Sequence, residues 1–171
     1  MSIGSTKIYP IGHDWVYALF AKEMRKSRVA IIKEDTKTHY LAYMSGVHPI
    51  GVVGYMDMGK GHYRLKTDYV RPNFRGQGVY SDLFISRLLL IFRGLKPNKL
   101  TAYCTMMSLP KYLKEGFIAM SERNGIVYVQ KLITNTHEEL QRLESRIPQS
   151  ITQTNQQSQD LGVDSPTQTM S

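Results

Sequence analysis

The sequence is poor in cysteine and has no long apolar run. Cys104 is the only cysteine among 171 residues, which excludes an intramolecular disulfide framework and any zinc site built from several cysteines. No apolar stretch approaches the roughly 20 residues that a transmembrane helix requires, and the run at 88–92 suits a buried helix. Residues 1–10 lack the charged and apolar segments of a secretory signal. These absences predict a cytoplasmic protein with no membrane partner.

The positive charge is concentrated in the first four-fifths of the chain. The whole chain carries +8, whereas residues 137–171 hold two arginines against five acidic residues, a net −3, which leaves +11 for residues 1–136. Such a region attracts polyanions: nucleic acid, an acidic partner or a phosphorylated cofactor. A basic surface without a specific partner fits the same numbers, because net charge governs encounter and solubility rather than chemistry.

The composition divides the chain near residue 135. From Thr134 onward there is no Phe, Tyr or Trp, and residues 149–171 are dominated by Gln, Ser, Thr and Asn. Such a segment buries too little apolar area to offset its conformational entropy. We therefore predict one folded domain over residues 1–135, a short helix over 136–147 and a disordered tail over 148–171.

Strands and helices alternate along the folded region and end in a hairpin. Asp14 is the expected N-cap of the first helix, and Asn124-Gly125 is a strong two-residue hairpin signal. Within 64–70, alternation predicts Leu65 on one face and Asp68 on the other. The pattern favours a mixed sheet covered by helices. Strands are expected at 7–9, 29–33, 40–44, 50–58, 64–70, 100–104, 117–120 and 126–130, and helices at 14–26, 78–92 and 109–114.

The segment 68–84 carries the clearest chemical signal. A strand ends at Val70, a turn with two glycines follows, and an amphipathic helix begins near Gly78. Glycine lets the backbone approach a ligand closely, and a helix N-terminus presents unpaired N–H groups with a partial positive charge. Arg75 adds a cation. The turn therefore suits phosphate, although many strand-to-helix turns contain glycine only in order to turn.

This segment resembles the acyl-CoA-binding motif of the GCN5-related N-acetyltransferases, in which a strand ends in Val-x-Pro and an Arg-Gly-x-Gly loop opens a helix. Here Val70, Pro72 and the loop 75–78 follow in that order. A second match is the tyrosine of a short helix followed by Gly-Phe, at 112–117. The resemblance covers residues 5–131. It implies an α/β (α+β) fold with a mostly antiparallel sheet of six to seven strands, a central splayed parallel pair and about four helices.

The resemblance also implies a mechanism with acetyl-CoA as co-substrate and no metal. Main-chain amides near Val70 would bind the pantetheine arm and polarise the thioester, and the amine of an unidentified acceptor would attack it directly. Tyr112 would protonate the departing thiolate. The general base stays open between Asp68, His62, Asp57 and a chain of water molecules. The cofactor-binding residues would be Val70, Arg75, Gly76, Gln77, Gly78, Val79 and Tyr80.

One departure from the family pattern leaves alternatives open. Tyr80 stands where many members have Gly or Ala, so its ring either shifts the diphosphate or turns inward onto the core. The leading interpretation is an N-acetyltransferase. One alternative, favoured by the basic region, is a nucleic-acid-modifying protein resembling the phage Mom-type DNA-modification proteins. The other is a binding module that has lost catalysis. The sequence leaves a homodimer open.

Overall fold

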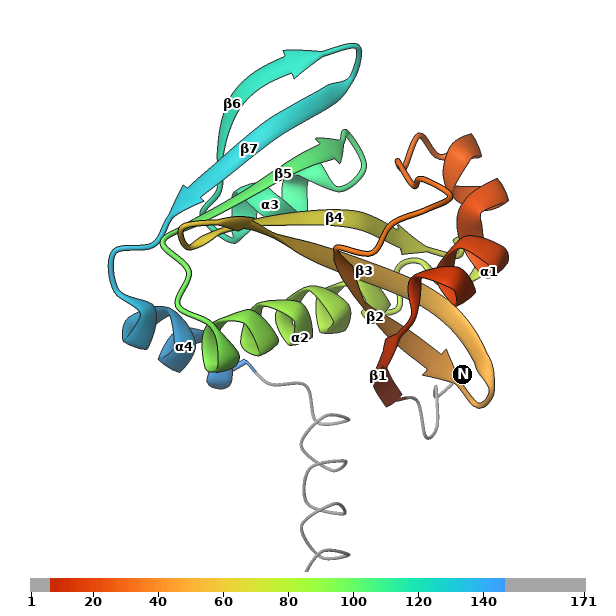
Figure 1. Cartoon of the computed structure of the whole chain (residues 1–171), viewed down its shortest axis with the longest axis horizontal. Coiled ribbons are helices and arrows are strands. Elements are labelled where there is room, and N and C mark those ends of the chain that lie inside the picture. The colour runs from red at the N-terminus through yellow and green to blue at the C-terminus, as the bar shows by residue number, and fades with distance from the viewer. Residues whose placement is uncertain (1–6, 147–171) are drawn as a thin grey trace, which may run out of the picture.

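The structure is a computed structural model that describes residues 7–146. In this part of the chain seven strands form one sheet in the order β1-β2-β3-β4-β5-β7-β6 (Figure 1). All neighbouring strands pair antiparallel except β4 and β5, which are parallel. The strands are β1 (Lys7–Ile11), β2 (Thr38–Ser45), β3 (His48–Gly59), β4 (His62–Val70), β5 (Lys99–Thr105), β6 (Ile118–Arg123) and β7 (Ile126–Leu132); the helices are α1 (His13–Lys26), α2 (Val79–Gly94), α3 (Leu109–Lys114) and α4 (Thr136–Glu144).

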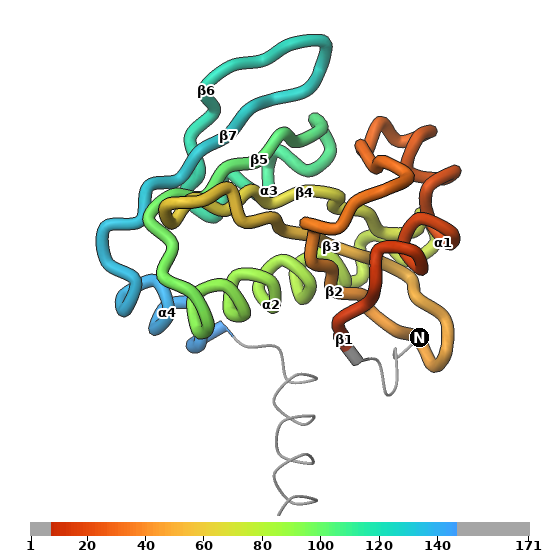
Figure 2. The backbone as a smooth tube through the Cα atoms, viewed as in Figure 1, coloured from red at the N-terminus to blue at the C-terminus, as the bar shows by residue number. Residues whose placement is uncertain are grey.

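The helices cover both faces of the sheet. Helix α1 packs Val16, Phe20 and Met24 against one face, while α2 and α3 contribute to a core on the other. Helix α4 lies beside α2 (Figure 1) and buries Leu143 in the same core. The β6–β7 hairpin extends beyond the body of the sheet (Figure 2). The fold class expected from the sequence is thereby confirmed, including the central parallel pair.

Local signals in the sequence place most elements correctly. The helix expected at 109–114 has those bounds, and Asn124 and Gly125, both with positive φ, form the turn between β6 and β7. Helix α4 falls within the range expected to be helical, with Asn135 as its N-cap. The expected tail, 148–171, lies outside the described residues. No helix within residues 7–146 has the length and apolar character needed to cross a bilayer.

Two local predictions are wrong. Residues 29–33 do not form a strand but connect α1 to β2. Strand β2 pairs with β1 along one edge and β3 along the other, so no edge remains for this segment; Val29 and Ile31 instead pack beside α1. Asp14 is not the N-cap, because α1 begins one residue earlier, at His13, after Gly12.

Strand β4 contains a bulge that changes which side chains share a face. Its pairing with β3 shifts register between Val52 and Gly54, and Thr67 opposite this point has φ of 59°, unusual for a β-branched residue. The extra residue rotates the strand after the bulge. Leu65 and Asp68, predicted on opposite faces, therefore both face α2.

The central strands β4 and β5 separate next to the bulge. Strands β4 and β5 pair only from His62 with Lys99 to Leu65 with Ala102. Beyond this point, no pairing between the two strands occurs in the described chain, although β4 continues to Val70 and β5 to Thr105. A gap therefore opens toward the C-terminal ends of both strands.

Outside this gap, a buried carboxylate connects α3 to the end of α4. The Glu115 side chain is 1% exposed and accepts two hydrogen bonds from the Arg146 guanidinium, at 2.9 and 2.6 Å. Arg142 and Lys111 lie 3.5 and 3.7 Å from the same carboxylate. Although burial raises the pKa of Glu115, the hydrogen bonds and charges of these cations lower it overall.

We expect Glu115→Gln to lower the free energy of unfolding at pH 7 by about 1–2 kcal/mol, because Arg146 and Arg142 lose their buried counter-ion. The loss is no larger because both arginines are partly exposed and can return to water. The folded-state pKa lies below the usual 4.5. The carboxylate therefore stabilises the fold fully above pH 4.5, its usual pKa. Its contribution is lost as the pH falls through the lower pKa of the folded state. Urea unfolding of both proteins between pH 7 and pH 3 (roughly the range that a glutamate titrates in) measures the difference, which should shrink with acidification.

The matched control is Glu144→Gln, which breaks the exposed pair between Glu144 and Arg93. Because solvent screens an exposed pair, this change should cost less than about 0.5 kcal/mol at any pH. If Glu144→Gln lowered the free energy of unfolding as much as Glu115→Gln does, burial would not be the reason that the Glu115 ion pairs stabilise the fold.

Candidate acyl-CoA site

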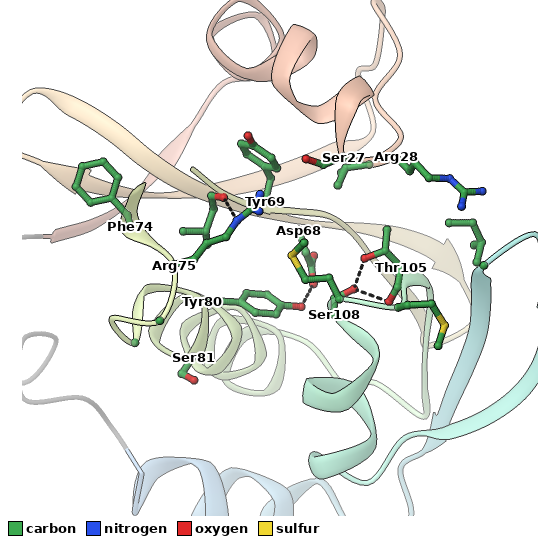
Figure 3. A pocket seen from close by; sticks show the side chains of 18 residues that line it. Ser27, Arg28, Asp68, Tyr69, Phe74, Arg75, Tyr80, Ser81, Thr105 and Ser108 are labelled. Carbon is green, nitrogen blue, oxygen red and sulfur yellow. Dashed lines mark hydrogen bonds between the residues drawn. The ribbon is translucent and has the colours of Figure 1, made fainter. Parts of the chain in front are cut away.

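The gap between β4 and β5 opens into a cavity of about 530 Å³. The ends of β4 and β5 form its floor, and the β4–α2 loop closes one side. The end of α1 and the β6–β7 turn form the other walls. Figure 3 shows Asp68 between Tyr80 and Ser108 in the middle of the cavity, with Ser27 and Arg28 on the opposite wall. The cavity thus joins the glycine loop between β4 and α2 to the gap that separates β4 from β5.

The β4–α2 loop presents main-chain N–H groups that have no acceptor within residues 7–146. Gly76 and Gly78 have φ of 77° and 85°, a conformation that other residues rarely adopt. Gly78 is the N-cap of α2, and the first amide with a partner in the helix is that of Asp82. The N–H groups of residues 76–81 therefore remain available at a helix N-terminus.

The side chains of this loop leave those amides accessible. The Gln77 amide donates to the Asn73 carbonyl at 3.2 Å, and Val79 is buried in the core. Arg75 lies folded back toward the strand, with its Nε donating to the Val70 carbonyl at 2.8 Å and its guanidinium over the Tyr69 ring. Gln77 and Val79 can therefore reach a ligand in this conformation only through the main chain.

The main chain of Val70 faces the gap. The Arg71 N–H donates to the Ile50 carbonyl of β3 at 2.9 Å. Because neighbouring residues of a strand direct their polar groups to opposite edges, the N–H of Val70 points away from β3. The Val70 carbonyl, on the same edge, is the group that Arg75 contacts. A thioester carbonyl in the gap would lie within reach of this N–H group.

Below the gap, Asp68 is the centre of a buried polar cluster. Arg87 of α2, whose side chain is fully buried, donates to both Asp68 oxygens, at 2.5 and 3.1 Å. The hydroxyls of Tyr80 and Tyr112 donate to Asp68 Oδ2 at 2.5 and 2.6 Å. Arg87 also donates to the Tyr112 hydroxyl at 3.3 Å and to the Gly54 carbonyl. All three partners thus hold the carboxylate in place.

Burial keeps the tyrosines of this cluster protonated. Desolvation, followed by the negative charge of Asp68, raises the pKa of Tyr112 well above its usual value of 10, and the same causes act on Tyr80. Burial disfavours the charged form of Arg87, but the charge of Asp68, its hydrogen bond and the two tyrosines together raise the pKa of the guanidinium. Arg87 is therefore a permanent cation and Tyr112 a hydroxyl that still carries its proton at neutral pH.

The sequence left open whether the Tyr80 ring shifts the diphosphate or turns inward onto the core. The ring turns inward, edge-on to Phe84 with ring centroids 5.8 Å apart, and the Tyr80 hydroxyl binds Asp68. Arg87 was missed by the sequence reasoning. Its signal was available: it follows Leu83 by four residues and Phe84 by three, so a helix places its side chain on the apolar face.

The other ionisable candidates do not gather at the gap. His62 and Asp57 lie at the opposite end of β4, where His62 bonds Thr101 and Asp57 accepts from the Gly59 N–H. Cys104 is buried, which raises the pKa of its thiol to about 11 and keeps it protonated. Within residues 7–146, no three His, Cys, Asp or Glu side chains come together as a metal site requires.

A second cavity of about 280 Å³ adjoins the first across the gap. Asp68, Thr105 and Ser108 line both cavities, and Tyr112 lines only the second. The second cavity extends along β4 toward Arg64 and is covered by residues 28–30 of the α1–β2 connection. A molecule in the first cavity and another in the second could therefore meet at the gap.

The chain was compared with known proteins by sequence and by structure. No family model matches it, and no curated protein matches it by sequence. Among solved structures, an acetyltransferase from Streptococcus agalactiae matches with a TM-score of 0.59 at 14% identity, covering 76% of this chain and 99% of that one. The N-acetyltransferase PaiA from Thermoplasma acidophilum, crystallised with coenzyme A, matches with 0.55 at 12%, covering 75% and 99%. The N-acetyltransferase PseH from Campylobacter jejuni matches with 0.53 at 18%, covering 75% and 99%.

At these identities the matches concern the fold. The chain has the fold of the acyl-CoA N-acyltransferases, that of the GCN5-related N-acetyltransferase superfamily. The resemblance noted in the sequence is confirmed at this level, and the matched region includes nearly the whole of each neighbouring chain.

Proposed function

We propose that the protein is an N-acyltransferase that moves an acetyl group from acetyl-CoA to an amine. The observation that carries this proposal is the row of unpaired N–H groups at residues 76–81, placed at the end of a gap between two parallel strands. The neighbour PaiA, which binds coenzyme A, supports the choice of cofactor. No metal enters the mechanism.

The diphosphate of the cofactor would bind the loop between β4 and α2. The N–H groups of residues 76–81 have no acceptor within residues 7–146, and the N-terminus of α2 favours negative charge. Arg75 would leave the Val70 carbonyl and turn to the phosphates, because a contact with an anion is stronger than its present contact with an uncharged carbonyl. The pantetheine arm would then follow the gap and bring the thioester to the Val70 N–H.

The chemistry requires polarisation of a carbonyl and protonation of a leaving group. The amine enters as its free base from the second cavity, attacks the thioester carbon and forms a tetrahedral intermediate whose oxygen the Val70 N–H stabilises. As the carbon–sulfur bond breaks, the Tyr112 hydroxyl gives its proton to the thiolate. The proton lost by the nitrogen passes to solvent, and the tyrosine is reprotonated from solvent.

Asp68 has a different part in this mechanism from that of the general base, for which it was one of several candidates. Both of its oxygens already accept hydrogen bonds from Arg87, and Oδ2 accepts two more from tyrosines. We therefore assign it as a positioning residue for Tyr112. When Tyr112 turns its proton to the thiolate, Arg87 and Tyr80 still satisfy Asp68, and Arg87 stabilises the developing phenolate.

Acetyl-CoA binding is the first test of the proposal. A ligand that binds only the folded protein raises its melting temperature, and at 100 times Kd the stabilisation is about 2.7 kcal/mol. We expect a concentration-dependent rise with acetyl-CoA and with CoA. No shift at millimolar cofactor would contradict the transferase proposal. A shift without release of CoA from acetyl-CoA in the presence of any amine would indicate a binding module that has lost catalysis.

Tyr112→Phe should lower kcat about 100-fold while changing the Kd for acetyl-CoA less than about threefold, because the hydroxyl acts on the leaving group rather than on cofactor binding. Release of free CoA by a saturating amine measures kcat. Tyr80→Phe is the matched control, since it removes another hydroxyl from the same oxygen of Asp68. An equal loss of kcat in the two variants would show that Tyr112 acts through the cluster and gives no proton.

A further inference from the structure

The second cavity, on the far side of the gap from the loop, is rich in positive charge. Arg28, Arg64 and Lys66 line it, and Asp68 is the only acidic residue among its lining residues. Asp68 cannot neutralise them, because its charge is already matched by the bidentate contact with Arg87. The cavity therefore has a positive potential where an acceptor would enter.

Two of these cations have no acidic partner among residues 7–146. Lys66 lies 3.6 Å from Asp35. Neither Arg28 nor Arg64 makes an ion pair in the described chain: Arg28 donates to the Asn124 carbonyl, and the Arg64 guanidinium lies over the Tyr103 ring, 5.1 Å from its centroid. The Arg64 Nε is buried and has no hydrogen-bond partner there. A buried donor without a partner is costly, so an anion that accepted a hydrogen bond from Arg64 would remove this cost.

The position of Arg64 separates it from the part of the site that would hold the cofactor phosphates. The loop with the free amides follows Val70, whereas Arg64 lies six residues before Val70 on the same strand. Six residues of strand span roughly 20 Å. Arg64 and Lys66 line the second cavity and not the first. The diphosphate would be at the other end of β4, so these charges are available for the acceptor.

We propose that the acceptor is a small amine that also carries an anionic group, a carboxylate or a phosphate, which Arg64 binds in the second cavity. This inference rests on the proposed transferase function and names the substrate class of the same site. A planar guanidinium binds either anion through two parallel hydrogen bonds. The volume of about 280 Å³ suits a small molecule, and the positive potential opposes polyamines and other acceptors with several positive charges.

Direct binding to the full chain tests this preference, with and without saturating CoA. Two matched pairs serve as probes in calorimetry: phosphoethanolamine against ethanolamine, and 4-aminobutyrate against 1,4-diaminobutane. In at least one pair the anionic member should bind about tenfold more tightly, and which pair shows it distinguishes phosphate from carboxylate. Its Kd should rise with salt concentration more steeply than the Kd of its partner in the pair, which has no anionic group.

Arg64→Gln should weaken binding of the preferred anionic probe about tenfold and leave CoA binding unchanged, and Arg64→Lys should restore part of the loss. Lys96→Gln is the matched control, because it removes the same charge at an exposed position that lines neither cavity. The melting temperature of each variant reports whether it folds. With acetyl-CoA, the same loss should appear in KM for the acceptor and not in kcat.

The outcomes separate the two proposals. Failure of CoA to bind would overturn the transferase proposal, while the titrations without CoA would still measure the preference. If CoA binds, then equal binding within both pairs, tighter binding of the diamine, or no binding of either anionic probe would overturn the acceptor class alone. Binding of duplex DNA that depends on Arg64, with none of the small anionic amines, would also overturn it in favour of a nucleic-acid acceptor.

Discussion

Gly78→Glu is expected to weaken acetyl-CoA binding about a thousandfold, equivalent to about 4 kcal/mol. The change places a carboxylate at the N-cap of α2, among the amides proposed to bind the diphosphate. Two like charges about 4 Å apart repel by about 4 kcal/mol near a protein surface, and the new side chain also competes for the N–H groups. Titration of the variant with CoA by calorimetry gives the change in Kd.

The control for this experiment must carry the same backbone strain. Gly78 has φ of 85°, so any side chain there is strained whatever its charge. Gly59, at the end of β3, has φ of 90° and equally open surroundings, and it lies far from the loop. Gly59→Glu should therefore lose similar stability but keep its affinity for CoA. Retained binding by Gly78→Glu would place the cofactor elsewhere.

Asp68→Asn is expected to lower the free energy of unfolding by about 3–5 kcal/mol, because it leaves the charge of Arg87 buried without a counter-ion. The Arg87 side chain is fully buried, so it cannot turn to water as a surface arginine would. The asparagine retains the shape of the side chain and one acceptor oxygen, which attributes the loss to charge rather than to packing. Equilibrium unfolding in urea measures it.

Removal of both charges provides the matched comparison. In the double variant Asp68→Asn with Arg87→Met, no charge is left buried, and most of the lost stability should return. Its kcat should stay low, because Tyr112 would have lost both Asp68, which orients its hydroxyl, and Arg87, which stabilises its phenolate. A double variant as unstable as the single one would show that the cluster stabilises the fold through its shape and hydrogen bonds rather than through its charge balance.

Prediction from sequence succeeded where the determining interactions are local. A glycine at a position of positive φ, an Asn-Gly turn or an apolar helix face depends on residues within a few positions of one another. The loop at 75–78, the turn at Asn124 and the short helix before Gly116 were therefore placed correctly. The prediction of a strand at 29–33 was wrong. The composition of this segment is typical of a strand, but it carries no information on β2, whose two edges are occupied by β1 and β3.

The sequence by itself determined the order of strands and helices except at residues 29–33, together with the glycine loop before α2 and the excess of positive charge. Only the tertiary structure decided that Asp68 faces Arg87, since that depends on a bulge in β4 where it pairs with β3. It also decided which cations remain without acidic partners, because Arg28 and Arg64 meet in one cavity only after distant segments have packed together. Local chemistry is encoded by neighbours in the chain, whereas burial and charge balance are properties of the assembled core and its surface.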